Sequence, residues 1–179
     1  MKKIISLVAS LTIISGVCAA VLAYVNCLTK APIAEMKVKQ EQDAVKAVLP
    51  QGVVKIEKAS KQVDGKDVEY YVGFGKDGKV VGYAARGSDK RGYGGLIELM
   101  VGFLADKKTV ECYKTLVASE TPGLGMNMNS PEFVGQFKGK DATNLKVKQD
   151  PGGTIEAITA ATITSRAVCY AIADARGKL

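Results

Sequence analysis

The feature that most restricts the fold of this chain is an uncharged, mostly apolar stretch from Ile4 to Leu28. Because an α-helix rises about 1.5 Å per residue, roughly 20 residues are enough to cross the hydrocarbon layer of a bilayer. The stretch also exceeds the apolar core of a secretory signal, which is roughly 7–15 residues long. A signal peptide cleaved before Tyr24 is the alternative, and a lipoprotein signal fits poorly because Asn26 precedes Cys27. We therefore expect an uncleaved transmembrane helix.

The charges beside this stretch predict its orientation and the organisation of the chain. Lys2 and Lys3 precede it, and positively charged flanks stay preferentially on the cytoplasmic side. Since no later stretch is long and apolar enough to return across the bilayer, we expect the remainder outside the cytoplasm. The sequence predicts a transmembrane anchor at residues 1–29, a helical stalk at 30–52 and a folded domain at 53–179.

Histidine and tryptophan are both absent from the 179 residues. Without histidine the chain cannot form a Ser-His-Asp triad, a Cys-His pair, a histidine-held zinc site or a histidine-ligated haem. Any chemistry must come from carboxylates, hydroxyls, lysines or a bound cofactor. We favour the bound cofactor, and we expect neither a catalytic side chain nor a metal site.

The four cysteines match no zinc or iron–sulfur spacing, since none of them forms a C-x-x-C pair. Cys18 and Cys27 lie inside the apolar stretch. Cys112 and Cys169 could form a disulfide outside the cytoplasm, but two buried free thiols are the favoured interpretation.

The formal net charge of +7 is spread along the chain and forms no basic cluster. Acidic residues are scattered among the lysines, and four phenylalanines with no tryptophan offer little surface for stacking bases. This composition argues against a nucleic-acid partner. We expect the surplus charge to act on anionic lipid headgroups or on an acidic partner subunit.

Beyond residue 30 the hydrophobic pattern predicts an α+β domain of strands gathered into hairpins, with helices at the ends. A helix is expected at residues 31–49, stopped at Pro50. A short helix or turn is expected at 131–138 and a final helix at 164–176. The expected strands are residues 53–60, 68–75, 80–87, 94–105 and 109–119, with weaker candidates at 147–150 and 154–158.

The same pattern predicts which helical faces are apolar and where hairpins turn. The first helix presents a stripe of Met36, Ala44, Val45, Val48 and Leu49. The last helix presents Val168, Ala171, Ile172 and Ala175. Turns are expected at Asp64-Gly65 and Asp77-Gly78, between the first three strands.

Hydroxyl side chains gather just before the last helix, in the segment Glu156–Val168. Thr159, Thr162 and Thr164 stand among small alanines, and Thr162 lies where the helix is expected to open. A helix N-terminus offers unpaired backbone N–H groups and a favourable dipole, so this position suits a phosphate. The alanines would let a bulky group approach the backbone. The alternative is that these hydroxyls only cap the helix.

A second segment, Ser119–Asn129, has the composition of a loop. Its Pro-Gly pair signals a type II turn, and a further glycine follows two residues later. Leu124, Met126 and Met128 would present apolar, polarizable side chains, which suit contact with a planar ring. The alternative is a simple turn with two methionines folded under it. A third glycine-rich segment, Gly92–Gly95, is neither a G-x-G-x-x-G motif nor a P-loop, because a predicted strand and not a helix follows it.

Together these segments resemble the FMN-binding domain shared by the G subunit of the Rnf ferredoxin:NAD oxidoreductase and the C subunit of the sodium-translocating NADH:quinone oxidoreductase. The run Glu120-Thr121-Pro122-Gly123-Leu124-Gly125 matches one signature of that family without a change. The run Glu156-x-x-Thr159-Ala160-Ala161-Thr162 resembles its other signature, Asp-x-x-Ser/Thr-Gly-Ala-Thr. The compact domain is more similar to the Rnf G subunit than to the longer C subunit.

The resemblance implies a cofactor and a set of residues that bind it. Thr162 would carry FMN covalently through a phosphoester. A separate flavin transferase is implied, because a threonine hydroxyl is a weak nucleophile without a base. The other implied cofactor-binding residues are Glu120, Thr121, Pro122, Gly123, Leu124, Gly125, Thr159, Ala160, Ala161, Ile163 and Thr164.

The resemblance also implies a role and a location. The chain would be a single-pass protein of the inner (cytoplasmic) membrane with its flavin domain on the extracytoplasmic, periplasmic side. It would transfer electrons in a Rnf-type complex that couples ferredoxin and NAD to ion translocation, with the other membrane subunits, the flavin transferase and the lipid bilayer as partners. The alternatives are the C subunit of the sodium-translocating enzyme, a stand-alone extracytoplasmic flavoprotein, or an anchored binding module without a cofactor.

Two positions depart from the family pattern. Ala160 stands in place of the glycine. If the backbone there needs a positive φ, alanine costs on the order of 1 kcal/mol. Glu156 stands in place of the aspartate, and keeps the charge while reaching one methylene further.

Overall fold

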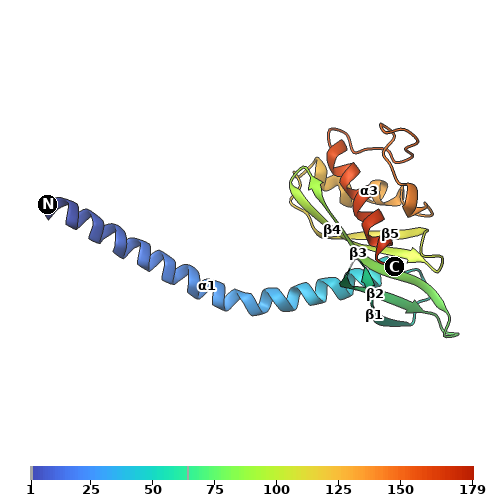
Figure 1. The fold of residues 1–179 in the computed structure, drawn as a ribbon, viewed down its shortest axis with the longest axis horizontal. Coiled ribbons are helices and arrows are strands. Elements are labelled where there is room, and N and C mark those ends of the chain that lie inside the picture. The colour runs from blue at the N-terminus through green and yellow to red at the C-terminus, as the bar shows by residue number, and fades with distance from the viewer. Residues whose placement is uncertain (1, 64) are drawn as a thin grey trace. The chain divides into compact units, whose positions relative to one another are not determined.

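The computed structural model describes residues 2–63 and 65–179. The chain divides into two compact units, residues 1–40 and 41–179. Helix α1 (Lys2–Val48) belongs to both, since its last eight residues lie in the second unit (Figure 1). The helix continues beyond the apolar stretch, as predicted. Pro32 lies inside it, although proline has no backbone N–H to donate to the helix.

The first unit is helical, and its large apolar side chains are exposed. A window of 18 residues in this helix has a mean hydropathy of 2.4. By length and composition, α1 is the one helix in the described part of the chain that could cross a membrane. Exposed apolar side chains along such a helix suit a lipid environment. Met36, predicted to belong to an apolar stripe, is 70% exposed in this unit and packs against nothing that would bury it.

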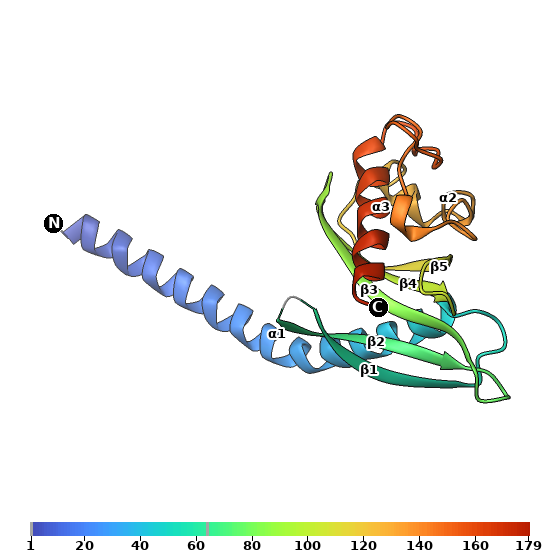
Figure 2. The ribbon, with the colours of Figure 1, turned by 45° about the vertical axis from the view of Figure 1, so that its right-hand side comes forward.

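The second unit is built on a five-stranded antiparallel sheet whose strands lie side by side in chain order (Figure 2). The predicted strands are therefore confirmed, although the third is longer than expected because its pairing continues to the turn at Gly92. Of the predicted turn at Asp64-Gly65, Asp64 lies outside the described residues. The strands are β1 (Lys55–Val63), β2 (Lys66–Phe74), β3 (Val80–Gly92), β4 (Gly95–Leu104) and β5 (Val110–Val117).

Helix α3 (Thr162–Gly177) covers one face of the sheet. Its predicted apolar face is confirmed, since Val168, Ala171, Ile172 and Ala175 are all buried. The helix approaches β3 so closely that a Cβ on Gly87 would lie 1.9 Å from the Ala171 carbonyl oxygen. Glycine at this position is therefore required by space.

The end of α1 covers the opposite face. Ala44, Val45, Val48 and Leu49 are buried there, as the sequence predicted. A Cβ on Gly102 of β4 would lie 1.8 Å from the Val48 carbonyl oxygen, so this glycine lets the second helix reach the sheet. One glycine on each face thus fixes how near a helix can lie.

Short elements connect β5 to α3. They are the 3₁₀ turns η1 (Gly125–Asn129) and η2 (Ala142–Asn144) and the short helix α2 (Pro131–Gly135). Ser130 caps α2, because its hydroxyl accepts a hydrogen bond from the Phe133 N–H. The short helix or turn predicted at 131–138 is a helix over Pro131–Gly135 followed by a turn.

The weak strands predicted at 147–150 and 154–158 are wrong. Only a single parallel bridge joins Val147 to Ile155. The residues between them turn back too sharply for a ladder, since Pro151 and two glycines follow Asp150 and the Gly153 N–H bonds to the Asp150 carbonyl.

Cys112 and Cys169 are free thiols on opposite faces of the sheet. This arrangement excludes the disulfide. The favoured interpretation of two buried free thiols is confirmed for Cys169, whereas the free thiol of Cys112 is only half-buried. Burial raises the pKa of the Cys169 thiol to about 12.

Candidate functional site

A cleft of about 530 Å³ opens where three segments of the second unit meet. These segments are the turn between β3 and β4, the loop after β5, and the residues that open α3. The residues that line the cleft are Tyr93, Glu120, Thr121, Leu124, Gly125, Ala160, Ala161, Thr162, Ile163 and Thr164. The two sequence segments singled out for their chemistry therefore build one site, although about 40 residues separate them along the chain.

Nine of the predicted binding residues line this cleft, and three do not. Pro122, Gly123 and Thr159 are exposed beside it. Gly123 has a φ of 75°, which the type II turn predicted there requires. Tyr93 lines the cleft but was not among the predicted binding residues. Its signal in the sequence was a lone aromatic residue between the glycines of a tight turn.

Glu120 joins the three segments at the base of the cleft. Its side chain is buried, with 6% of the residue exposed. One carboxylate oxygen, Oε2, accepts a hydrogen bond of 2.8 Å from the Thr164 hydroxyl. The other, Oε1, accepts one of 3.1 Å from the Gly94 N–H. Both oxygens are therefore held by groups of the protein.

Ala160 has a left-handed backbone, with φ at 59°. Among the described residues only Lys107 shares this feature without being glycine. This conformation turns the chain sharply before α3. Glycine, which the family pattern has at this position, adopts the same conformation without strain. The backbone condition of the prediction for Ala160, a positive φ, is therefore met, and the cost of alanine there stays a prediction.

The threonines do not cap α3, so that alternative is wrong. The cap position is Ala161, which offers no side-chain acceptor. Thr164 is used instead to reach Glu120, and the Ser165 hydroxyl donates to the Ala161 carbonyl while accepting from the Ile158 N–H. The helix begins two residues earlier than predicted, and Thr162 is its first residue.

Thr162 is partly exposed at the cleft, and its hydroxyl forms no hydrogen bond with another described residue. Within the described part of the chain, the backbone N–H groups of Thr162, Ile163 and Thr164 also have no acceptor. Three free N–H groups at the start of a 16-residue helix form a cradle for an anion.

The outer wall of the cleft is apolar. Tyr93, Leu124 and Ile163 are 72%, 42% and 49% exposed, respectively. Large apolar side chains that gather around a hollow while remaining exposed are typical of a ligand site. None of the described residues that line the cleft is lysine or arginine, and Glu120 is the one with a charge.

Glu156, which takes the place of the family's acid, lies away from the cleft. Its carboxylate is 3.3 Å from the Lys148 ammonium, and both groups are largely exposed. Its backbone N–H and C=O bond to the side-chain amide of Gln136. Glu156 thus helps to hold the segment before α3 in place through its backbone.

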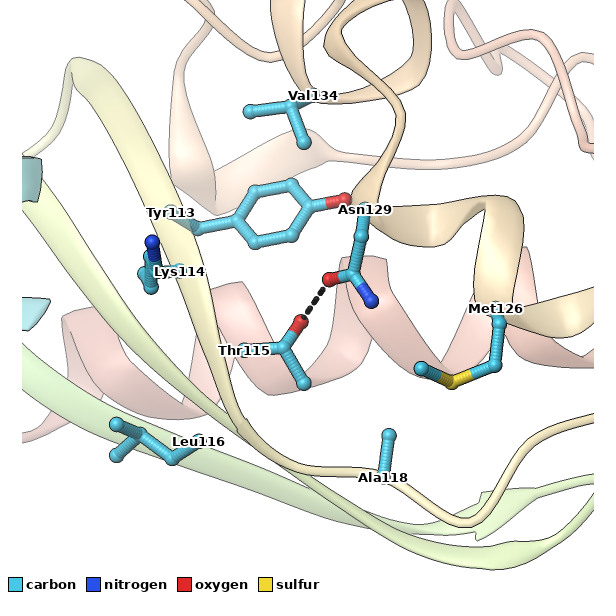
Figure 3. Close-up of a pocket in the computed structure, with 8 residues that line it drawn as sticks. All are labelled: Tyr113, Lys114, Thr115, Leu116, Ala118, Met126, Asn129 and Val134. Atoms are coloured by element: carbon cyan, nitrogen blue, oxygen red, sulfur yellow. Dashed lines mark hydrogen bonds between the residues drawn. The ribbon is translucent and has the colours of Figure 1, made fainter. Parts of the chain in front are cut away.

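A second cleft, of about 470 Å³, is lined by residues of β5, of the loop after it, of η1 and of α2 (Figure 3). Met126 points into it, and the Thr115 hydroxyl donates to the Asn129 side-chain oxygen across its floor. Met128 is fully buried in the core beneath η1. Of the three apolar loop side chains considered in the sequence, only Leu124 therefore faces the first cleft.

Comparison with known proteins agrees with this site. A family model described as FMN-binding domain matches residues 92–177, which include all three segments of the cleft. Two solved structures share the fold. NqrC of Shewanella oneidensis is 22% identical with a TM-score of 0.51, over 68% of this chain and 64% of that one. The C subunit of the Na(+)-translocating NADH-quinone reductase of Parabacteroides distasonis is 22% identical with a TM-score of 0.53, over 70% and 75%.

Relatives of similar length extend the match to the helix α1. The G subunit of the ion-translocating oxidoreductase complex of Methanosarcina acetivorans is 34% identical over 97% of this chain and 93% of its own. The G subunit of the proton-translocating ferredoxin:NAD(+) oxidoreductase complex of Clostridium ljungdahlii is 37% identical over 97% and 90%. The Na(+)-translocating counterpart of Acetobacterium woodii is 32% identical over 93% and 87%.

Fold and cleft together define an FMN-binding domain carried behind a helix that is able to span a membrane. The relatives that match along almost the whole chain are all G subunits, so they identify the family to which the chain belongs more specifically than the domain does. This chain belongs to the family of G subunits of ion-translocating oxidoreductase complexes.

Proposed function

We propose that this chain is a membrane-anchored electron-transfer subunit that carries FMN covalently on Thr162. It acts in a complex that couples electron transfer between ferredoxin and NAD to ion translocation. The observation that carries the proposal is the single cleft in which both family segments meet, with the Thr162 hydroxyl open to it. The names of the relatives, at 32–37% identity over most of the chain, support the complex.

The residues of the cleft fit FMN. Its volume of about 530 Å³ lies within the range of roughly 300–1,000 Å³ for small-molecule sites. The three free N–H groups at the start of α3 can receive phosphate oxygens. The exposed side chains of Tyr93, Leu124 and Ile163 can receive an apolar ring. Ala160 and Ala161 leave the backbone close to the ligand.

The covalent link is proposed at Thr162 because its hydroxyl is unpartnered among the described residues and lies beside the N–H cradle. Forming the phosphoester joins the Thr162 oxygen to the phosphorus of the flavin donor and releases the hydroxyl proton. The donor is activated as a phosphoanhydride, so the P–O bond to its second phosphoryl group breaks and that group leaves as a phosphate monoester. No described side chain is placed to accept that proton, so we propose that a flavin transferase brings both the base and an activated flavin donor.

When bound, the isoalloxazine ring supplies the redox chemistry. The chain holds the phosphate end at α3, covers the ring with apolar side chains and keeps the flavin from being lost by dissociation. We further propose that residues 1–29 form the membrane anchor, 30–52 the stalk and 53–179 the flavin domain. The domain lies on the extracytoplasmic side, and the remaining membrane subunits of the complex are its partners.

The test is expression of the full chain with and without a flavin transferase, followed by denaturing electrophoresis under ultraviolet light. Wild type is expected to give a fluorescent band only with the transferase. Thr162→Val is expected to lose the band. Thr154→Val is the matched control, because Thr154 is an exposed threonine that lies outside the signature run and does not line the cleft.

Fluorescence that disappears in Thr162→Val and persists in Thr154→Val supports the covalent site. Fluorescence that persists in Thr162→Val moves the link to another residue and contradicts our assignment. No fluorescence in wild type with an active transferase supports the anchored module without covalent cofactor. Copurification with the other membrane subunits from native membranes tests the proposed complex separately.

A further inference from the structure

We infer that Glu120 is a positioning residue that holds the flavin cleft together and does not itself bind the cofactor. The inference rests on the proposed function, because it concerns the same cleft. Its basis is that both carboxylate oxygens are already hydrogen-bonded to protein groups from two different segments.

The two bonds connect parts of the chain that no strand pairing joins at this point. Gly94 lies in the turn between β3 and β4, 26 residues before Glu120, and Thr164 lies 44 residues after it in α3. Thr164 is 1% exposed, so this bond is shielded from water. Among the described residues, no other hydrogen bond joins the turn that carries Tyr93 to the start of α3 at the base of the cleft.

The surrounding glycines leave the room that this carboxylate occupies. A Cβ on Gly125 would lie 2.5 Å from Glu120 Oε2 and 2.9 Å from the Thr164 hydroxyl oxygen. A Cβ on Gly92 would lie 2.7 Å from Glu120 Oε1. Neither glycine has a positive φ, so space and not backbone conformation requires them. Gly125, the last residue of the Glu-Thr-Pro-Gly-Leu-Gly run, is thus required because the side chain of Glu120, its first residue, occupies the space that a Cβ would fill.

The partners of Glu120 are both neutral. Among the described residues no lysine or arginine forms an ion pair with it, although eight ion pairs occur elsewhere. The geometry therefore requires two polar atoms at fixed positions. One must accept from the Gly94 N–H, and the other must form a hydrogen bond with the Thr164 hydroxyl. Glutamine can supply them, since its carbonyl oxygen can accept from the Gly94 N–H while its amide donates to the Thr164 oxygen. Glu120→Gln is thus the conservative variant.

The consequence for function is that Glu120 sets the distance between the apolar wall and the phosphate cradle. Tyr93 lies in the turn that Glu120 fixes, directly before Gly94, and Thr162 lies two residues before Thr164, which Glu120 also fixes. Loss of the link would let the two sides of the cleft separate before flavin is attached.

The experiment compares Glu120→Ala, Glu120→Gln and the control Glu132→Ala, whose side chain is exposed on α2. Two readouts are taken on the full chain in detergent. Amide hydrogen exchange of Gly94 is measured without flavin, and flavin fluorescence per protein is measured after expression with the transferase. Glu120→Ala is expected to exchange Gly94 about tenfold faster and to load about tenfold less flavin. Glu120→Gln and Glu132→Ala are expected to match wild type in both readouts.

A second pair of variants serves if Glu120→Ala does not fold. Thr164→Val removes one of the two bonds while keeping the shape of the side chain, and Thr164→Ser keeps the hydroxyl. We expect reduced loading in Thr164→Val and restoration in Thr164→Ser. Equal loading in Thr164→Val and wild type would overturn the inference.

The remaining outcomes separate this inference from the proposed function. If Glu120→Gln loses loading while Gly94 stays protected, the charge of Glu120 acts on the flavin and the positioning role is wrong. If Glu120→Ala leaves both readouts unchanged, the link is dispensable and the inference also fails. If wild type loads no flavin at all, the proposed function fails, whereas the exchange of Gly94 still reports on Glu120.

Discussion

Ala160 gives the sharpest test of how the segment before α3 is built. Its φ of 59° places an L-residue with a Cβ in the left-handed region, which costs about 1–2 kcal/mol. Ala160→Gly removes this cost but increases the entropy of the unfolded chain, by about 0.4–1 kcal/mol. With mid-range values of about 1.5 and 0.7 kcal/mol for these two terms, the net gain in the free energy of unfolding is about 0.8 kcal/mol. For a domain of this size, we expect a rise in melting temperature of about 1–4 °C.

The assay is thermal and urea unfolding of the full chain in detergent, with Ala161→Gly as the matched control. Ala161 has a φ of −135° and a buried methyl group, so glycine there relieves no strain and removes a contact. Ala161→Gly is expected to lower the melting temperature. If Ala160→Gly were neutral or destabilising, the assignment of stored strain at this turn would be refuted.

Three further predictions follow from the packing and the cleft. Gly102→Ala brings a Cβ to 1.8 Å from the Val48 carbonyl oxygen and should cost on the order of 1–3 kcal/mol by urea unfolding, whereas Gly135→Ala, with nothing within 4 Å, should be nearly neutral. Burial raises the pKa of the Cys169 thiol from its ordinary 9.0 to about 12. The free energy of unfolding therefore contains the full contribution of the protonated thiol below pH 9, and this contribution is lost as the pH rises from 9 toward 12. Alkylation at neutral pH should therefore modify Cys169 only after urea is added, and modification in the native state would contradict its burial. Tyr93→Ala should leave the free energy of unfolding within about 1 kcal/mol of wild type, because the side chain is exposed, yet shift the absorption spectrum of attached flavin; an unchanged spectrum would place the ring elsewhere.

The sequence was sufficient for the sheet and its covering helices, for physical reasons. Five runs with strand composition were separated by short polar turns, and the two helices carried apolar stripes that end at Leu49 and begin near Val168. The spacing of apolar residues reflects which side chains a strand or helix buries. It can therefore be seen in the sequence without knowledge of the tertiary structure. The weak strands near 147–158 failed because one buried bridge between Val147 and Ile155 produces the same apolar spacing as a short ladder.

The site was predictable in its members but not in its internal bonds. The threonines before α3 satisfied the pattern for helix caps, and local pattern cannot show that Thr164 is instead bonded to Glu120, 44 residues away. Tyr93 was missed because an aromatic residue in a tight turn carries no periodic signal, and its place beside the cleft depends on how β3 and β4 pair. Met128 looked available in a loop, yet η1 folds it into the core.

The central claim is a covalent bond between FMN and the side-chain oxygen of Thr162. Its most direct test is tandem mass spectrometry of the chain purified from its native membranes, with fragment ions that bracket residues 159–164. We predict that the added mass of one FMN, less one water, falls on Thr162 alone. An unmodified Thr162 in that peptide, or the same mass on Thr159 or Thr164, would contradict the account.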